Sequence, residues 1–255
     1  MTVEIEQFFC RGDNFGILMR DAASGTVALV DAPEEAPILA AIARTGWTPS
    51  LLLVTHHHAD HVEANLALKA RFGLRIIGPA AEAEKIPGID DKVAGGGTVA
   101  LGSQTVRVIE TPGHTAGHVS YHLPEAGVVF TGDTLFSLGC GRLFEAGPET
   151  MFASLARLAA LPDETRVYCG HDYTLANARF ALSVDAGNAT LQARAREVEA
   201  LRAVGRATLP TTIRAEKAAN PFLRAGDPAI RKALAMEAAT DAAVFAELRR
   251  RKDNF

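Results

Sequence analysis

The stretch LLLVTHHHADH, residues 51–61, places four histidines and one aspartate directly after an apolar run. The run is typical of a buried strand, and the side chains of an extended segment alternate between two faces. The residues that would share one face are His56, His58 and Asp60. His57 would point to the other face, and His61 can join the first group if a helix beginning near Val62 turns the chain. A fold for this chain must give this strand end a polar environment.

The same order of residues, an apolar run followed by a turn residue and a polar side chain, occurs three more times. VRVIETPGH ends on His114, VVFTGD ends on Asp133, and RVYCGH ends on His171. Open α/β sheets build their sites from side chains that follow strand ends. We therefore expect these side chains to meet those of the 51–61 stretch.

Together the four segments predict a metal centre. A catalytic zinc ion takes three protein ligands and a water, so this set is too large for one ion and fits two ions that share a carboxylate. The expected ligands are His56, His58, Asp60, His61, His114, Asp133 and His171. Their nitrogen and oxygen atoms suit zinc best and also admit iron or manganese.

Three further polar residues have weaker patterns. His118 and His122 lie in or beside a strand, and we interpret them as structural residues or as outer neighbours of a ligand. Asp31 ends the run VALVD, where it would either orient a ligand histidine or form a turn.

Helical and strand-like patterns interleave up to about Tyr173, which predicts a mixed α/β domain over residues 1–173. The patterns predict hairpins in 3–30, helices at 33–45, 63–72 and 149–161, and strands at 51–54, 75–77, 105–110, 119–123, 128–130 and 166–170. Beyond Tyr173, alanine, arginine and glutamate recur at helical spacing, so we predict a helical domain over 174–255. Its longest helix should span Asn188 to Val204.

The composition narrows the class of protein. A chain of 255 residues, 48% of them hydrophobic, can bury a large core, and its three cysteines are too few and too far apart for a disulfide framework. A net charge of -4 disfavours a nucleic-acid partner. No apolar run approaches the roughly 20 residues of a membrane span, and Glu4 and Glu6 stand where a signal peptide would be basic. We expect a cytoplasmic monomer.

The motifs THHHADH, TPGHTAGH, FTGDTLF and CGHDYT, in this order, resemble those of the metallo-β-lactamase superfamily. Within it, GCGRLFE and the ending NPFLR…RRRKDNF are similar to the hydroxyacylglutathione hydrolases, also called glyoxalase II. The resemblance covers nearly the whole chain. It implies a four-layer αββα sandwich followed by a small α-helical domain.

The resemblance also implies roles for single residues. The first metal ion would be held by His56, His58 and His114, the second by Asp60, His61 and His171, with Asp133 shared and Asp60 also orienting the nucleophile. The implied glutathione contacts are Arg142, Tyr173, Arg249 and Lys252. The last two lie in the basic ending ELRRRKDNF, which by itself suits either a small anion or the negative pole of a helix. At Phe144 the human-type enzyme has a tyrosine, so this chain lacks a hydroxyl there.

The implied reaction is hydrolysis of S-(2-hydroxyacyl)glutathione, such as S-D-lactoylglutathione, to glutathione and a 2-hydroxy acid, the second step of methylglyoxal detoxification. One alternative is a persulfide dioxygenase-like enzyme of the same superfamily with a single iron. Another is a binding module without activity, which the complete ligand set disfavours. A nuclease is disfavoured because the chain has no extended basic arm.

Overall fold

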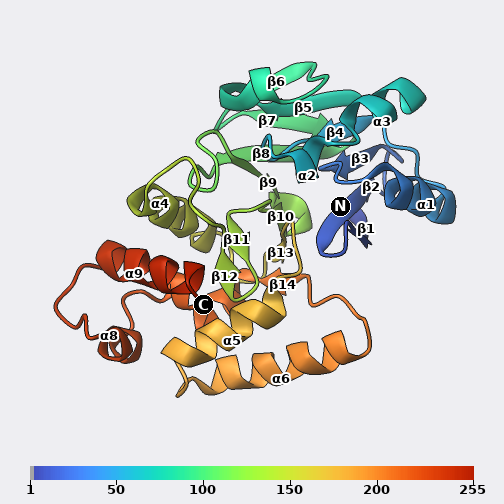
Figure 1. Cartoon of the computed structure of the whole chain (residues 1–255). Coiled ribbons are helices and arrows are strands. Elements are labelled where there is room, and N and C mark those ends of the chain that lie inside the picture. Colours follow the sequence, from blue (N-terminus) through green and yellow to red (C-terminus); the bar gives the residue numbers. More distant parts are fainter. Residues whose placement is uncertain (1–2) are drawn as a thin grey trace. The chain divides into compact units, whose positions relative to one another are not determined.

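The first three strands form antiparallel hairpins, as the short strand-like runs and turns of residues 3–30 predict. The computed structural model describes residues 3–255, and the chain divides into two compact units (Figure 1). The first unit comprises Met1–Glu110 and Thr115–Gly132, and the second comprises Thr111–His114 and Asp133–Phe255. Met1 and Thr2 of the predicted first domain lie outside the described residues.

Strands dominate the first unit, and helices connect several of them. Its strands are β1 (Val3–Cys10), β2 (Asn14–Asp21), β3 (Val27–Val30), β4 (Leu51–Leu53), β5 (Arg75–Pro79), β6 (Asp91–Val93), β7 (Thr98–Leu101), β8 (Gln104–Glu110), β9 (Val119–Leu123) and β10 (Val128–Phe130). Its helices are α1 (Glu35–Thr45), α2 (Ala59–Val62), α3 (Asn65–Phe72) and the 3₁₀ segments η1 (Ala80–Lys85) and η2 (Pro124–Ala126).

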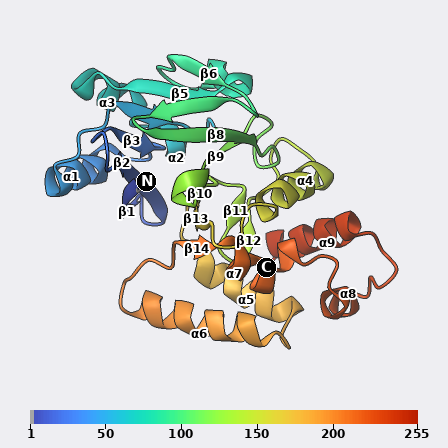
Figure 2. The same cartoon turned by 180° about the vertical axis from the view of Figure 1, so that it is seen from behind.

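The strands of this unit form two layers. β1 to β6 make one mixed sheet in chain order, parallel from β3 onward, and β7 to β10 pair antiparallel. One face of the first sheet packs against α1 and α3 through a core that includes Leu29, Ile38 and Leu68 (Figure 2). Tyr121 on β9 donates a hydrogen bond of 2.7 Å to the carbonyl oxygen of Val54, which joins the two strand layers. Both faces of β3 and β4 are therefore buried, as a parallel arrangement requires.

The second unit is mainly helical. Its strands are β11 (Leu135–Phe136), β12 (Gly139–Cys140), β13 (Arg166–Tyr168) and β14 (Thr211–Thr212). Its helices are α4 (Pro148–Ala159), α5 (Thr174–Val184), α6 (Ala189–Ala203), α7 (Ile213–Ala219), η3 (Pro221–Leu223), α8 (Pro228–Leu234) and α9 (Asp241–Asp253). α5 and α6 lie side by side in both views and pack through alanines and leucines (Figures 1 and 2).

A buried polar pair holds the hairpin β11–β12 in place. Asn220 donates hydrogen bonds from its side chain to the carbonyl oxygens of Phe136 and Gly139 and to the carboxylate of Glu216. Glu216 also accepts from the Leu138 N–H at 2.8 Å. Burial raises the pKa of Glu216, although these donors act against that shift. The motif NPFLR therefore supports a hairpin that lies far from it in the sequence.

Most predicted elements occur near their expected positions. The helix predicted at 33–45 is α1, and it ends where Gly46 takes the left-handed conformation and donates to the carbonyl of Ile42. The predicted longest helix is α6, which begins after Asn188. The expected turn near Val62 comes earlier, because α2 already begins at Ala59. The sequence patterns did not reveal β6, β7 or the hairpin β11–β12, and β14 interrupts the region predicted as wholly helical.

The two compact units are defined by contacts within the chain and do not test the predicted domain boundary between residues 173 and 174. That boundary stays a prediction. Within residues 3–255, no helix combines the length and the apolar character that crossing a membrane requires.

Candidate metal centre

The loop after β4 positions two adjacent imidazole nitrogens. Nε2 of His56 lies 3.2 Å from Nδ1 of His58, and His56 is fully buried. The Thr55 hydroxyl donates to Asp31 Oδ2 at 2.9 Å, so its oxygen remains to accept from Nδ1 of His56 at 3.0 Å. Nδ1 of His56 therefore carries the proton, and Nε2 presents a lone pair.

Asp31 also orients His61, so the structure favours the outer-neighbour interpretation of this aspartate. Its Oδ2 lies 2.9 Å from Nδ1 of His61, and the carboxylate fixes the ring with Nε2 facing away. Nε2 of His61 is 3.7 Å from Oδ2 of Asp60. Asn14, which no sequence pattern singles out, donates to both the side chain and the carbonyl of Asp60 at 3.1 Å.

The expectation that Asp60 extends the alternation of a strand is wrong. His58 is extended, with φ -61° and ψ 144°, but Asp60 and His61 lie in the helical turn α2. Adjacent residues of a helical turn are only about 100° apart around its axis, so Asp60 and His61 can lie close together without the parity of a strand.

Three predicted ligands lie in the second unit around one carboxylate oxygen. Oδ2 of Asp133 is 3.4 Å from Nε2 of His114 and 3.3 Å from Nε2 of His171. Nδ1 of His114 lies 2.9 Å from the carbonyl oxygen of Arg142, which can only accept, so Nδ1 carries the proton. The ring of Tyr173 stacks nearly parallel to that of His171, with the ring centroids 4.6 Å apart.

The spacing of these atoms fits a metal ion. Ligand atoms held about 2.0–2.2 Å from one ion at tetrahedral angles lie about 3.3–3.6 Å apart. The four pairs described above span 3.2 to 3.7 Å. In His56 and His114 the proton on Nδ1 leaves the lone pair of Nε2 to face the ion. The donor set of imidazole and carboxylate suits zinc, iron or manganese.

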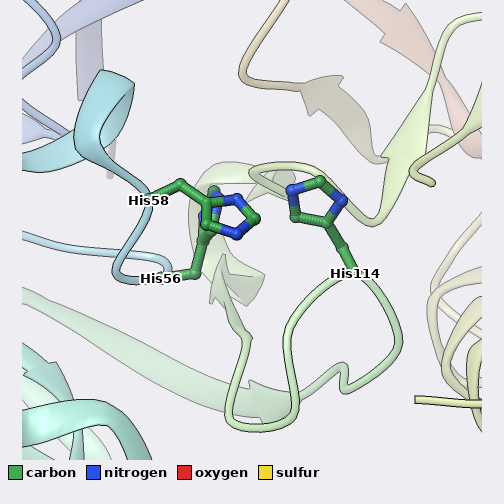
Figure 3. A group of neighbouring side chains, drawn as sticks. All are labelled: His56, His58 and His114. Atoms are coloured by element: carbon green, nitrogen blue, oxygen red, sulfur yellow. The ribbon is translucent and has the colours of Figure 1, made fainter. Parts of the chain in front are cut away.

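Among the described residues, four groups of three side chains have ligand atoms that all lie within 4.8 Å of one another, and three of these groups contain only predicted ligands. These three groups are His56, His58 and His114; His56, His61 and Asp133; and Asp60, His61 and His171. Figure 3 shows the three histidines of the first group, with the rings of His56 and His58 close together. All seven predicted ligands occur in these groups. Among the described residues, neither His118 nor His122 belongs to such a group.

Two predicted substrate residues are exposed. The side chain of Arg142 is 66% accessible and lies 3.9 Å from the carboxylate of Asp253. Tyr173 is 38% exposed, and Phe144 is 61% exposed with its ring 5.2 Å from that of His114. These three side chains are thus accessible to a ligand, and two of them contact predicted metal ligands.

The predicted substrate residue Arg249 is only 4% exposed. Its guanidinium donates to the carbonyl oxygen of Cys140 at 2.8 Å and to the carboxylate of Asp253 at 2.7 Å. Lys252 is half-buried, and burial lowers its pKa, with the charges of Arg249 and Arg142 acting in the same direction. Within the basic ending, Arg249 is therefore packed into the second unit and Lys252 partly so, whereas Arg250 is exposed.

The cysteines have no feature of a nucleophile. Cys10, Cys140 and Cys169 are buried free thiols, and burial raises the pKa of Cys140 to about 11. A thiol in this state is inert.

Glu82 is a further residue near the centre that the sequence patterns do not reveal. This buried residue of η1 accepts hydrogen bonds from the backbone and the ring of His57. Nothing in the sequence around Glu82 signals this contact, because its partners lie in distant segments.

Comparison with known families assigns almost all of the chain. Residues 18–171 match the metallo-beta-lactamase superfamily, and residues 172–255 match the hydroxyacylglutathione hydrolase C-terminus.

Curated relatives cover the complete chain. A hydroxyacylglutathione hydrolase of Mesorhizobium japonicum is 66% identical over 255 residues, with 100% of both chains covered. Proteins of the same name from Chelativorans sp. and Rhizobium meliloti are 66% and 59% identical, again over 100% of this chain and at least 99% of their own.

Solved structures confirm the fold class. ETHE1 from Myxococcus xanthus superposes with a TM-score of 0.70 at 27% identity, covering 97% of this chain and 90% of its own. TTHA1623 in a di-iron-bound form gives a TM-score of 0.64 at 27% identity, covering 86% of this chain and 100% of its own.

Proposed function

The chain belongs to the hydroxyacylglutathione hydrolases of the metallo-beta-lactamase superfamily, and we propose that its seven clustered side chains bind two divalent metal ions for thioester hydrolysis. The substrate is S-(2-hydroxyacyl)glutathione, with S-D-lactoylglutathione as the expected example. The products are glutathione and a 2-hydroxy acid. This is the second step of methylglyoxal detoxification.

The position of Asp133 is the observation that carries the proposal of two ions. One of its oxygens is 3.4 Å from His114 and 3.3 Å from His171, and these histidines belong to the two different proposed ligand sets. A carboxylate between two sets is the arrangement that a shared ligand requires. The di-iron form of TTHA1623 supports the same number of ions.

We assign His56, His58 and His114 to one ion, Asp60, His61 and His171 to the other, and Asp133 to both. Divalent ions in such a site polarise a carbonyl oxygen and lower the pKa of water, so that a nucleophile is available at neutral pH. Zinc is the first choice among ions that these ligands accept. Asp60, held by Asn14, would orient the attacking nucleophile toward the thioester carbon.

The glutathione part of the substrate carries two carboxylates and needs cations. Arg142 is exposed enough to form a charge-assisted contact, and Lys252 lies in the same unit on α9. Tyr173 would contribute its ring and hydroxyl. Phe144 keeps an aromatic surface beside His114 but has no hydroxyl to donate a hydrogen bond. We therefore expect glutathione to be held by one hydrogen bond fewer than in an enzyme with tyrosine at this position. Placement of this kind contributes much of the rate in a hydrolase.

Hydrolysis of S-D-lactoylglutathione by the purified chain tests the proposal. Activity should disappear after chelator treatment and return with about two equivalents of zinc, iron or manganese. Oxygen consumption with glutathione persulfide, without thioester hydrolysis, would instead support a persulfide dioxygenase. We also propose that the protein is a cytoplasmic monomer with domains 1–173 and 174–255. Gel filtration would test the monomeric state, and limited proteolysis would test the boundary between the domains.

A further inference from the structure

The middle histidine of the HHH triplet, residues 56–58, has a partner that the metal centre does not explain. Glu82 Oε2 accepts from the backbone N–H of His57 at 2.7 Å and lies 2.8 Å from the Nδ1 atom of the same residue. The second oxygen, Oε1, accepts from the Thr115 hydroxyl and from the Gly117 N–H at 2.9 Å. One carboxylate thus joins η1, the segment between two proposed ligands, and the segment that follows His114.

Glu82 is only 4% exposed, so it forms these bonds away from water, where they are strongest. The N–H of His57 belongs to the peptide group that links His56 to His57. Holding that peptide group restrains the backbone torsions on either side of it, in the segment that carries His56 and His58. The ring of His57 lies against the same oxygen, and its centroid is 5.0 Å from that of the His58 ring.

Gly117 gives a second, independent sign that the chain is built around this carboxylate. A Cβ atom at this position would lie 2.6 Å from Cγ of Glu82 and 2.7 Å from Cβ of Ala81. No side chain fits there without moving η1. The close approach of the loop to Glu82 therefore requires glycine.

We propose that Glu82 is a positioning residue for the metal ion held by His56 and His58, and that His57 serves as its backbone anchor. The inference rests on the proposed binuclear function and adds a residue to it. It predicts that loss of Glu82 weakens one ion selectively. The second ion depends on His61, which Asp31 orients instead.

Asp21 provides a matched control in the same unit. It is also a buried carboxylate that accepts from backbone N–H groups and hydroxyls, in this case of Ser24 and Ser103. It joins two turns and contacts no proposed ligand in the described part of the chain. Asp21→Asn should therefore reproduce a loss of stability without a change in metal binding.

Cobalt titration of metal-free protein separates the outcomes. Wild type and Asp21→Asn should take up two equivalents of Co²⁺ with the same visible spectrum. Glu82→Gln should bind one of the two about 10–100-fold more weakly, with altered absorption of that ion. Gly117→Ala, which displaces the carboxylate without removing it, should show the same selective loss and serves if Glu82→Gln does not fold.

Three results of the titration would contradict the proposal, and each has a different meaning. Normal uptake by wild type with unchanged affinities in Glu82→Gln and Gly117→Ala would overturn this inference alone. No uptake by wild type would overturn the proposed function and this inference together. The ligand atoms of His57, Glu82 and Glu145 also lie within 4.8 Å of one another, which offers a third outcome. A third equivalent in wild type that Glu82→Gln loses would make Glu82 a ligand and overturn its role as a positioning residue.

Discussion

At the scale of single residues, Asp31 shows how one side chain sets the protonation of others. Its backbone has φ 54°, a left-handed conformation that aspartate and asparagine tolerate better than most residues. Its Oδ1 accepts from the Thr55 N–H at 2.8 Å, and its Oδ2 faces the Thr55 hydroxyl and His61. Three groups thus depend on a carboxylate that only accepts.

Asp31→Asn should therefore impair metal binding while keeping the backbone. If the amide oxygen takes the place of Oδ1, the NH₂ group faces Nδ1 of His61 and favours the tautomer with its proton on Nε2, which cannot bind a metal. We expect about 10–100-fold lower kcat/KM and a reduced metal content, measured by thioester hydrolysis and elemental analysis. Asp91→Asn, at an exposed pair with Arg75, should change neither. Full metal content in Asp31→Asn would contradict the tautomer argument.

Arg249→Ala should raise KM more than it lowers kcat, because the buried Arg249 holds Asp253, whose carboxylate lies 3.9 Å from the predicted substrate residue Arg142, so its loss acts on substrate binding. The burial of Arg249 adds a second effect, since its removal leaves the Cys140 carbonyl without this donor and should cost about 1–3 kcal/mol of stability. Steady-state kinetics and thermal unfolding measure the two effects separately. Arg250→Ala, exposed and paired with Glu247, is the control for charge on the same helix. Equal losses in kcat and kcat/KM would exclude a role in substrate placement.

At the scale of elements, buried carboxylates hold turns together in both units. Glu216 and Asn220 support the hairpin β11–β12, and Asp21 joins the turn after β2 to the turn between β7 and β8. Hydrogen bonds from the hydroxyl of Ser24 and the N–H of Ser103 hold the pKa of Asp21 well below its ordinary value of 3.8.

This shift makes the contribution of Asp21 to stability dependent on pH. The unfolded chain binds the proton first as the pH falls, so the stabilisation is complete above the ordinary pKa and is lost below it, as the pH falls toward the folded pKa. Asp21→Asn should lower the melting temperature by about 2–4 °C at pH 7. Calorimetry from pH 7 to pH 3 should show this difference shrinking below about pH 4. A difference that stays constant over this range would show that the charge of Asp21 does not contribute.

At the scale of the whole molecule, the sequence predicts those structural features that residues close together in the chain determine. The strand before the HHH triplet, the end of α1 at Gly46 and the helix after Asn188 follow from local patterns. The sequence does not predict partners that are distant in the chain, such as Glu82 for His57 or Asn220 for β11–β12. Strand alternation gives the wrong environment for Asp60 because α2 begins one residue before it.

The same separation along the chain makes metal binding a source of stability for the folded state. The proposed ligands come from segments around residues 56–61, 114, 133 and 171, which an unfolded chain cannot hold together. An ion at 100 times its dissociation constant stabilises the folded state by about 2.7 kcal/mol. For a chain of this size, this corresponds to a rise of about 5–10 °C in melting temperature.

Calorimetry of metal-free protein with increasing zinc should therefore show a melting temperature that rises with the logarithm of the free metal concentration. The rise should weaken below about pH 6.5, because protons compete for the imidazole nitrogens. Mg²⁺ at the same concentration is the control, since it prefers oxygen ligands and should produce little shift. The melting temperature could instead stay constant with added zinc while elemental analysis shows bound zinc. This result would mean that the ions bind without linking these segments in the folded chain.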